Sequence, residues 1–283
     1  MLGLISVAIA ADEDAPAPRG EKITLKLNLP KGEKRSLNSD MDMKMSMTAA
    51  GQAFDIGMKM GTGMSVVCQD VNAEGIHTLK MTYDKLRMAM LMGGAPLIDY
   101  DSSRADNAPN PVTGAFEALV GGELIVKMKP TGETVAVEGL DELAEKAAKK
   151  APGQNAAQLK EQIKGMAQSF EQMQAAYPKE PVDIRDSWES ELDMTTDPNM
   201  PMKVKAKYTL YDRKDGVAII KVDGTISSTA GLKGTMKGTM NMDEKTGWIK
   251  GGDMDMKLAG TMNDPNAGQI QMSMTGKIKM SDK

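Results

Sequence analysis

The chain has 283 residues, of which 41% are hydrophobic and 26% are charged, and this balance is typical of a folded globular protein. Its 35 basic and 39 acidic residues are closely interspersed and give a net charge of −4, which argues against nucleic acid as a partner because phosphate binding needs a basic surface. One cysteine and one histidine exclude an intramolecular disulfide, and they leave too few ligands and bases for a zinc site or a nucleophilic triad.

The N-terminal residues have the character of a secretion signal. They are apolar and end in Ala8-Ile9-Ala10, a small-x-small pattern typical of a cleavage site. We therefore interpret residues 1–11 as a signal-peptide remnant, which predicts export to the periplasm or the extracellular space. A run of about 11 residues is too short to span a bilayer, so no stable membrane span is expected. Residues 12–20 are expected to be a flexible lead-in.

The first half of the chain alternates between apolar and polar residues, which is the period of a half-buried strand. Strands are predicted at 23–29, 36–48, 53–70, 75–92 and 123–129. Pro130-Thr131-Gly132 predicts a tight hairpin into a further strand at 133–137. Residues 93–111 are rich in Gly, Pro, Asn and Asp and predict a long surface loop, followed by a short helix at 113–120.

Two single residues in this half have predicted environments. Cys68 shares the alternation of Met64 and Val66, which predicts a buried and inert thiol. His77 follows a turn at the start of a strand, which predicts a position at the surface or at an edge.

The middle of the chain is helical in pattern. Residues 140–151 are rich in Ala, Glu and Lys and lie between Gly139 and Pro152. Residues 154–177 then carry apolar residues at alternating intervals of four and three, which predicts a longer helix with one apolar stripe. The stripe consists of Leu159, Ile163, Met166, Phe170, Met173 and Tyr177. We expect it to cover the apolar face of the sheet, and a coiled-coil dimer is the alternative.

The strand pattern then resumes to the end of the chain. Strands are predicted at 186–195, 203–211, 216–227, 231–243, 246–261 and 268–280. Consecutive hairpins predict an antiparallel meander, and glycines within its strands indicate curvature or bulges. The predicted fold is mainly β (α+β): a large curved antiparallel sheet or half-barrel, with a helical segment at about 140–177 on its concave face. It is expected as a single domain over 21–283, with strands in 21–137, helices in 138–177 and the meander in 182–283.

Three segments are similar to a known family. The segment Tyr177-Pro-Lys-Glu-Pro181-Val-Asp-Ile-Arg-Asp-Ser187-Trp188 resembles the FP-x-x-P-V-x-x-G-D-S-W pattern of a bacterial family of exported domains of unknown function, with Arg185 in place of Gly. Residues 124–139 are similar to its central hairpin, and 234–249 to its closing G-x-x-x-G … D-x-x-T-G stretch. More distantly, the order of elements is similar to the half-barrel lipoprotein carriers of the LolA and LppX type. That likeness implies an apolar cavity covered by helices, but a fold does not fix a function.

Methionine is the most informative residue type. The chain holds 27 Met but only 3 Phe, 2 Trp and 5 Tyr. Carboxylates such as Asp40 and Asp255 alternate with Met on the expected solvent face, so a glycosidase-like pair is not expected. We therefore predict no enzyme activity, no cofactor and no metal site built on His, Cys or carboxylates.

Three hypotheses for the methionines stay open. In the first hypothesis, the methionines fill the core of a structural or protein-interaction domain of the cell envelope, which would have a protein partner. They line a concavity for a lipid or another apolar small molecule, since unbranched Met suits varied apolar partners. Or Met-x-Met pairs on strands bind Cu(I). The predicted lining residues are Met41, Met43, Met45, Met47, Met58, Met60, Met166, Phe170, Met173, Met254, Met256, Met272 and Met274.

Overall fold

The protein is mainly β, as predicted. The computed structural model describes residues 19–49, 51–104, 117, 119–150, 177–194, 202–264 and 268–282. The strands are β1 (Lys34–Ala49), β2 (Gln52–Val71), β3 (His77–Met92), β4 (Ala95–Asp101), β5 (Glu123–Met128), β6 (Thr134–Glu138), β7 (Ser187–Met194), β8 (Met202–Lys214), β9 (Val217–Ser228), β10 (Leu232–Asp243), β11 (Ile249–Asp264) and β12 (Gly268–Ser281). The helix α2 spans Leu140–Lys150.

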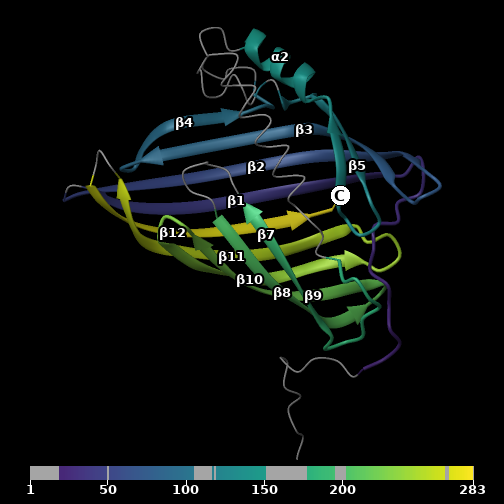
Figure 1. Cartoon of the computed structure of the whole chain (residues 1–283). Coiled ribbons are helices and arrows are strands. Elements are labelled where there is room, and N and C mark those ends of the chain that lie inside the picture. Colours follow the sequence, from purple (N-terminus) through teal and green to yellow (C-terminus); the bar gives the residue numbers. More distant parts are fainter. Residues whose placement is uncertain are drawn as a thin grey trace, which may run out of the picture.

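All twelve strands belong to one antiparallel sheet. Its order is β6-β5-β3-β2-β1-β12-β11-β10-β9-β8-β7, and β4 pairs with β3 off this path (Figure 1). Two meanders, β1 to β6 and β7 to β12, are therefore joined where the first strand pairs with the last. Asn38 lies opposite Ser281 at one end of this central pairing, and Ala49 lies opposite Ile270 at the other. The path does not close on itself, so the sheet is a curved open trough and not a closed barrel.

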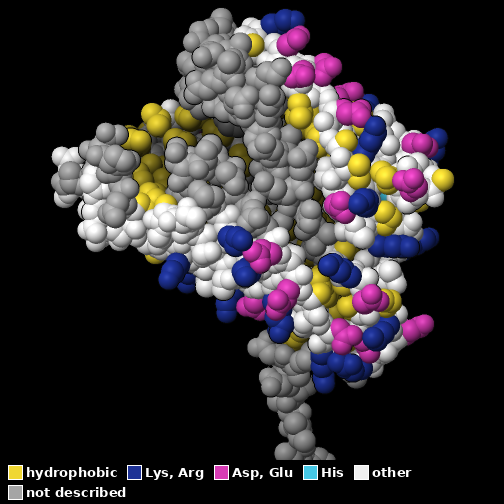
Figure 2. Space-filling view, in the orientation of Figure 1, with side chains coloured by type: hydrophobic (Ala, Val, Ile, Leu, Met, Phe, Trp, Pro, Cys, Tyr) yellow, Lys and Arg dark blue, Asp and Glu magenta, His cyan; other side chains and the backbone are white. Residues whose placement is uncertain are grey.

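Strand alternation divides the sheet into two chemically distinct faces. Directly opposed residues of antiparallel strands share a face, so the register shows which side chains lie together. One face carries charged residues that pair across strands, as in Arg87–Asp40 at 2.9 Å and Lys237–Asp223 at 3.5 Å. The other face is apolar and lines the hollow of the trough. Figure 2 shows hydrophobic side chains inside this hollow and charged side chains around it.

An extended segment, residues 23–29, crosses one end of the hollow. Its leucines at 25, 27 and 29 are only 1–3% exposed. Leu25 packs with the concave face of β8 to β10, whereas Leu27 and Leu29 pack with that of β2 and β3. We call this segment the strap. The alternation predicted at 23–29 is correct, but a sheet strand is wrong, because the strap makes only an isolated bridge from Ile23 to Val182.

Turns from both halves of the sheet hold the strap in place. The Leu27 amide donates to the carbonyl of Pro130, between β5 and β6, at 2.8 Å. The Asn28 amide donates to the carbonyl of Thr246, between β10 and β11, at 2.9 Å. The strap thus ties the two meanders together at one end of the trough, which we call the closed end.

The predicted loop at 93–111 is wrong over its first part, because it contains β4. Gly93 and Gly94 have φ of 56° and 84° and form a tight turn that returns the chain along β3. Ile98 and Tyr100 are then buried against β3. The Gly and Pro residues mark a hairpin and an edge strand here, where Pro is tolerated. Residues 105–111 lie outside the described part of the chain.

The helix at 140–151 is confirmed as α2. Leu143 and Ala144 pack with Tyr83 and Leu124, on the concave side of β3 and β5 near the edge of the sheet. Burial raises the pKa of Tyr83 to about 12. Of the helix predicted at 113–120, Glu117, Leu119 and Val120 are described: Glu117 and Leu119 are helical, whereas Val120 forms an isolated bridge with Tyr83. The helix predicted at 154–177 lies outside the described residues up to position 176.

The described helix is neither long nor apolar enough to cross a membrane.

Cys68 is buried as predicted, but His77 is not at the surface. Cys68 is 0% exposed and His77 only 3%. His77 lies opposite Met128 at the closed end, so its side chain is on the concave face. Met128 packs against the strap cluster, by which we mean Leu27, Leu29, Val66, Cys68 and Leu79. Burial lowers the pKa of His77 below its ordinary value of 6.5.

The buried imidazole predicts a loss of stability in acid. Below about pH 6.5 the unfolded chain binds a proton at His77 that the folded chain resists, so the free energy of unfolding falls as the pH drops. Urea unfolding at pH 7.5, 6.5 and 5.5 should show a steeper loss for the wild type than for His77→Gln. Parallel curves for the two proteins would contradict the assignment.

Candidate functional site: the methionine face

The methionines of the central strands form a grid on the concave face. Met41 lies opposite Met60, which lies opposite Met88 on the next strand. One step along the strands, Met43 lies opposite Met58, which in turn lies opposite Met90. Same-face neighbours are about 7 Å apart along a strand, and opposed Cβ atoms are about 5 Å apart across strands. Six thioethers from β1, β2 and β3 therefore share one continuous surface.

The grid continues across the centre of the sheet into the second meander. Met45 lies opposite Met274 and Met47 opposite Met272, both on β12. Further on, Met256 of β11 lies opposite Met236 of β10. The methionine grid thus extends over at least six neighbouring strands, and no single Met-x-Met motif accounts for it.

A glycine lets methionines meet above the central strand β12. Gly276 lies opposite Met43 on one side and Met256 on the other. A Cβ atom at Gly276 would be 3.4 Å from Met43 Cγ and from Met256 Cε, which is at the lower limit of ordinary van der Waals contact. Gly276 therefore gives both side chains room to lie over the backbone of β12.

Burial differs between the methionine face and the core at the closed end. Leu25, Leu210 and Ile220 at the closed end are at most 1% exposed. Most methionines of the grid are only half-buried, with Met88 at 6% exposure as an exception. The packed core at the closed end consists mainly of branched aliphatic residues, with Met240 and Met242 also buried in it, whereas the methionines of the grid line the partly accessible surface beside it.

Ten of the predicted lining residues lie on this face. They are Met41, Met43, Met45, Met47, Met58, Met60, Met254, Met256, Met272 and Met274. Met166, Phe170 and Met173 lie outside the described residues. Met88, Met90 and Met236 also lie on this face. They are absent from the predicted lining residues, although the alternation of Met88 and Met90 indicates the shared face from the sequence.

Aromatic side chains extend the face to the edge strand β7. Trp188 stacks on Tyr208 with ring centroids 5.7 Å apart and an interplanar angle of 14°. A pocket of about 790 Å³ borders this stack, and Thr131 from the β5–β6 turn and Tyr177 also line it. Residues from both ends of the strand order therefore meet around one pocket. The Tyr177 hydroxyl donates to the Gly247 carbonyl at 2.8 Å, and burial raises the Tyr177 pKa.

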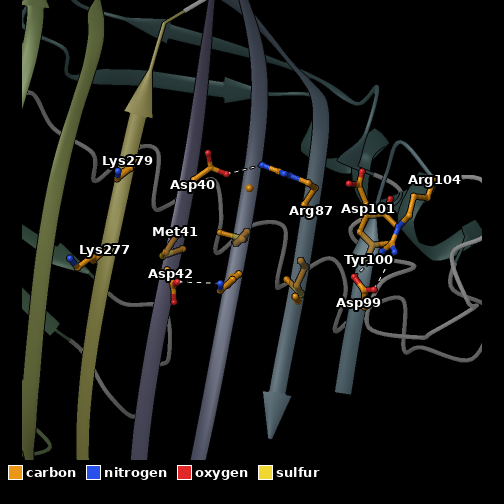
Figure 3. Close-up of a pocket in the computed structure, with 15 residues that line it drawn as sticks. Asp40, Met41, Asp42, Arg87, Asp99, Tyr100, Asp101, Arg104, Lys277 and Lys279 are labelled. Atoms are coloured by element: carbon orange, nitrogen blue, oxygen red, sulfur yellow. Dashed lines mark hydrogen bonds and ion pairs between the residues drawn. The ribbon is translucent and has the colours of Figure 1, made fainter. Parts of the chain in front are cut away.

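A groove of about 590 Å³ is lined mostly by charged residues, together with Met41, Met60 and Met88 (Figure 3). Its carboxylates pair with neighbouring cations: Arg87 donates to Asp40 at 2.9 Å and Arg104 to Asp99 at 2.8 Å. The Arg104 hydrogen bond lowers the pKa of Asp99. As predicted, Asp40 lies on the solvent face. No cluster of three His, Cys, Asp or Glu residues able to hold a metal occurs in the described part of the chain.

Residues 74–249 match a family described as "Family of unknown function (DUF6263)", and this region is more than half of the chain. The chain belongs to this family. All three segments that suggested a family of unknown function fall within the matched region, and the segment at 177–188 lines the pocket beside Trp188. No curated protein matches the DUF6263 chain.

Solved structures resemble the DUF6263 chain only in outline. Lipovitellin, in a structure titled "Lipid-protein interactions in lipovitellin", is 9% identical with a TM-score of 0.47. That match covers 90% of this chain, which spans 25% of the lipovitellin chain. DynF, from the dynemicin biosynthesis pathway of Micromonospora chersina, is 8% identical with a TM-score of 0.19, covering 98% and 92% of the two chains.

An outer membrane channel (COG4313) from Pseudomonas putida F1 is 8% identical with a TM-score of 0.22, covering 91% and 97%. At these identities and TM-scores, the three likenesses say nothing about the ligand of the DUF6263 chain.

Proposed function

We propose that this protein is an exported, non-catalytic binder of an apolar ligand, such as the acyl chain of a lipid, on its methionine face. The observation that carries the proposal is the grid of thioethers in cross-strand register, half-buried on the concave side of the sheet. Methionine is flexible and polarisable, so such a surface adapts to chains of varied shape.

The contrast in burial favours binding over a purely structural core. A filled core would bury its large apolar side chains completely, as the closed end does with Leu210 and Ile220. Met43, Met58 and Met256 are left partly accessible instead. A ligand that covers these side chains would bury further apolar surface, and each Å² removed from water stabilises the complex by about 25 cal/mol.

The test uses a polar replacement of nearly the same shape. Met43→Gln/Met58→Gln introduces two amides into an opposed pair, whereas Lys44→Gln/Lys59→Gln changes neighbouring positions on the charged face. Delipidated protein is titrated with cis-parinaric acid, whose fluorescence rises in apolar surroundings. We expect the methionine variant to bind at least about tenfold more weakly, because each amide must be desolvated, and the lysine variant to bind as the wild type does.

Native mass spectrometry of the protein from its own host should in addition reveal a bound lipid. A wild type that does not bind the probe, or equal binding by both variants, would overturn the proposal.

Cu(I) binding is a second candidate, because the register brings three thioethers together across strands, as in Met41, Met60 and Met88. Thioethers select Cu(I) over harder ions. Met41→Leu/Met60→Leu keeps the surface apolar and removes two sulfur atoms. An anaerobic Cu(I) titration should show a loss of affinity in this variant while acyl binding persists. A wild-type affinity no tighter than micromolar would dispose of the copper hypothesis.

A further inference from the structure

The end of the sheet opposite the strap consists of hairpin tips. β1–β2, β3–β4 and β11–β12 all turn there, since Ala49 pairs with both Gln52 and Ile270, and Met92 pairs with both Ile56 and Ala95. Figure 1 shows these turns gathered at one side, away from the labelled C-terminus. The methionine face runs along the strands to these tips. We call this end the open end.

Large apolar side chains project from the open end. Phe54, Leu91, Met92 and Leu97 are 41%, 41%, 46% and 53% exposed. Only two other large hydrophobic side chains in the described part of the chain are classed as exposed, Val71 at 36% and Val135 at 48%. The apolar surface of the open end therefore stands out from the rest of the protein.

These side chains project from both faces of the tips. Phe54 and Met92 lie opposite Met47 and Ile56 and thus belong to the concave face. Leu91 lies opposite Gly57 on the other face, which is charged elsewhere in the sheet. Leu91 thus adds a large apolar side chain to the charged face at the open end, where the exposed Asp55 of the β1–β2 tip also lies.

The hairpins also lack cations near the open end. Residues 45–58, 88–103 and 258–276 contain no Lys or Arg, although the chain has 35 of them. Beside the strap, by contrast, Lys22, Lys26 and Lys31 are all exposed. Lys233 beside the β9–β10 turn is an exposed cation at the same end of the sheet, but these three hairpins offer no positive charge to phosphate groups or to an acidic protein. Their exposed side chains can therefore be stabilised mainly by apolar burial.

We propose that the tips of β1–β2 and β3–β4 insert into the apolar layer of a phospholipid bilayer, which places the open end of the methionine face at the membrane surface. A bilayer fits better than a protein partner. The four side chains expose on the order of 300 Å², well below the roughly 800 Å² per partner of a stable protein interface. They also point to both sides of thin hairpins, which suits a fluid apolar layer that surrounds them.

The test is flotation with phosphatidylcholine vesicles. The tip variant is Phe54→Ser/Leu91→Ser/Met92→Ser/Leu97→Ser. Its matched control, Val71→Ser/Val135→Ser, removes exposed apolar side chains elsewhere on the protein. We expect the wild type and the control to float equally at 0.1 M and 0.5 M NaCl, and the tip variant to bind at least about tenfold more weakly. The altered side chains are exposed, so the fold should persist, and circular dichroism checks this.

Three outcomes would overturn the membrane proposal: no wild-type flotation at millimolar lipid, equal flotation of the tip variant, or tip-dependent self-association without lipid in sedimentation velocity. The membrane proposal does not rest on ligand binding. In the parinaric acid titration without vesicles, the tip variant should bind as the wild type does. A wild type that binds the probe but does not float contradicts the membrane proposal alone. A wild type that floats but does not bind the probe contradicts the ligand-binding proposal alone.

Discussion

Gly247→Ala is expected to destabilise the protein by about 3 kcal/mol or more. Gly247 has a φ of 69°, and a Cβ atom there would overlap the carbonyl group of Lys26 in the strap and lie 3.0 Å from the Leu27 nitrogen. Alanine would therefore be strained and would also push the strap off the β10–β11 turn. The loss should include the hydrogen bond from Asn28 to Thr246. Urea denaturation measures the change.

Gly216→Ala separates the backbone strain at a positive φ from the steric overlap with the strap. Gly216 has a similar φ of 75°, but a Cβ atom there would meet nothing within 4 Å. Its substitution should cost only the conformational strain of about 1–2 kcal/mol. The difference between the two variants then measures how closely the strap approaches the turn. Equal losses would show that the strap is not seated on Gly247.

Leu29→Ala should cost about 2–5 kcal/mol, because it opens a cavity in a packed cluster. Leu29 is 1% exposed and packs with Val66, Cys68 and Leu79. The chain's single thiol provides a local probe, because Cys68 Sγ donates to the Leu29 carbonyl at 3.4 Å and is fully buried. We expect the variant to react with a thiol reagent in the folded state much faster than the wild type.

Asn28→Ala is the matched control for the strap. Asn28 is exposed, and its side chain makes one hydrogen bond of 3.2 Å to the Lys245 carbonyl. Its loss should cost about 1 kcal/mol or less and leave Cys68 protected. A reactive thiol in Asn28→Ala, or a protected one in Leu29→Ala, would mean that the strap does not cover Cys68.

The sequence predicted most of the sheet because side-chain alternation is a local signal. Met41 to Met47 alternate strictly with polar residues, and the same holds for Met254 and Met256. Each such run shows which of its residues share a face, and the cross-strand register then places the methionines of neighbouring strands on one common surface. The shared methionine face could thus be predicted without knowing which strands are neighbours.

The remaining features depend on contacts that local pattern does not contain. Residues 23–29 alternate like a strand, yet they cross the end of the trough because turns distant in sequence accept their amide hydrogens. His77 is buried because the strap cluster lies next to it, which its own neighbours do not indicate. β4 follows two glycines and contains a proline, signals shared by loops and by edge hairpins.

The pairing of β1 with β12 has a consequence for how the chain reaches this structure. The central strand β12 follows all the other described strands in the sequence, so β1 and β11 each keep an unpaired edge until β12 has been synthesised. Both edges alternate Met with polar residues and are open to pairing with other chains. Contacts between opposite ends of a sequence also form slowly. The folding chain is therefore most prone to aggregation just before β12, a strand of 14 residues, becomes available to pair with both edges.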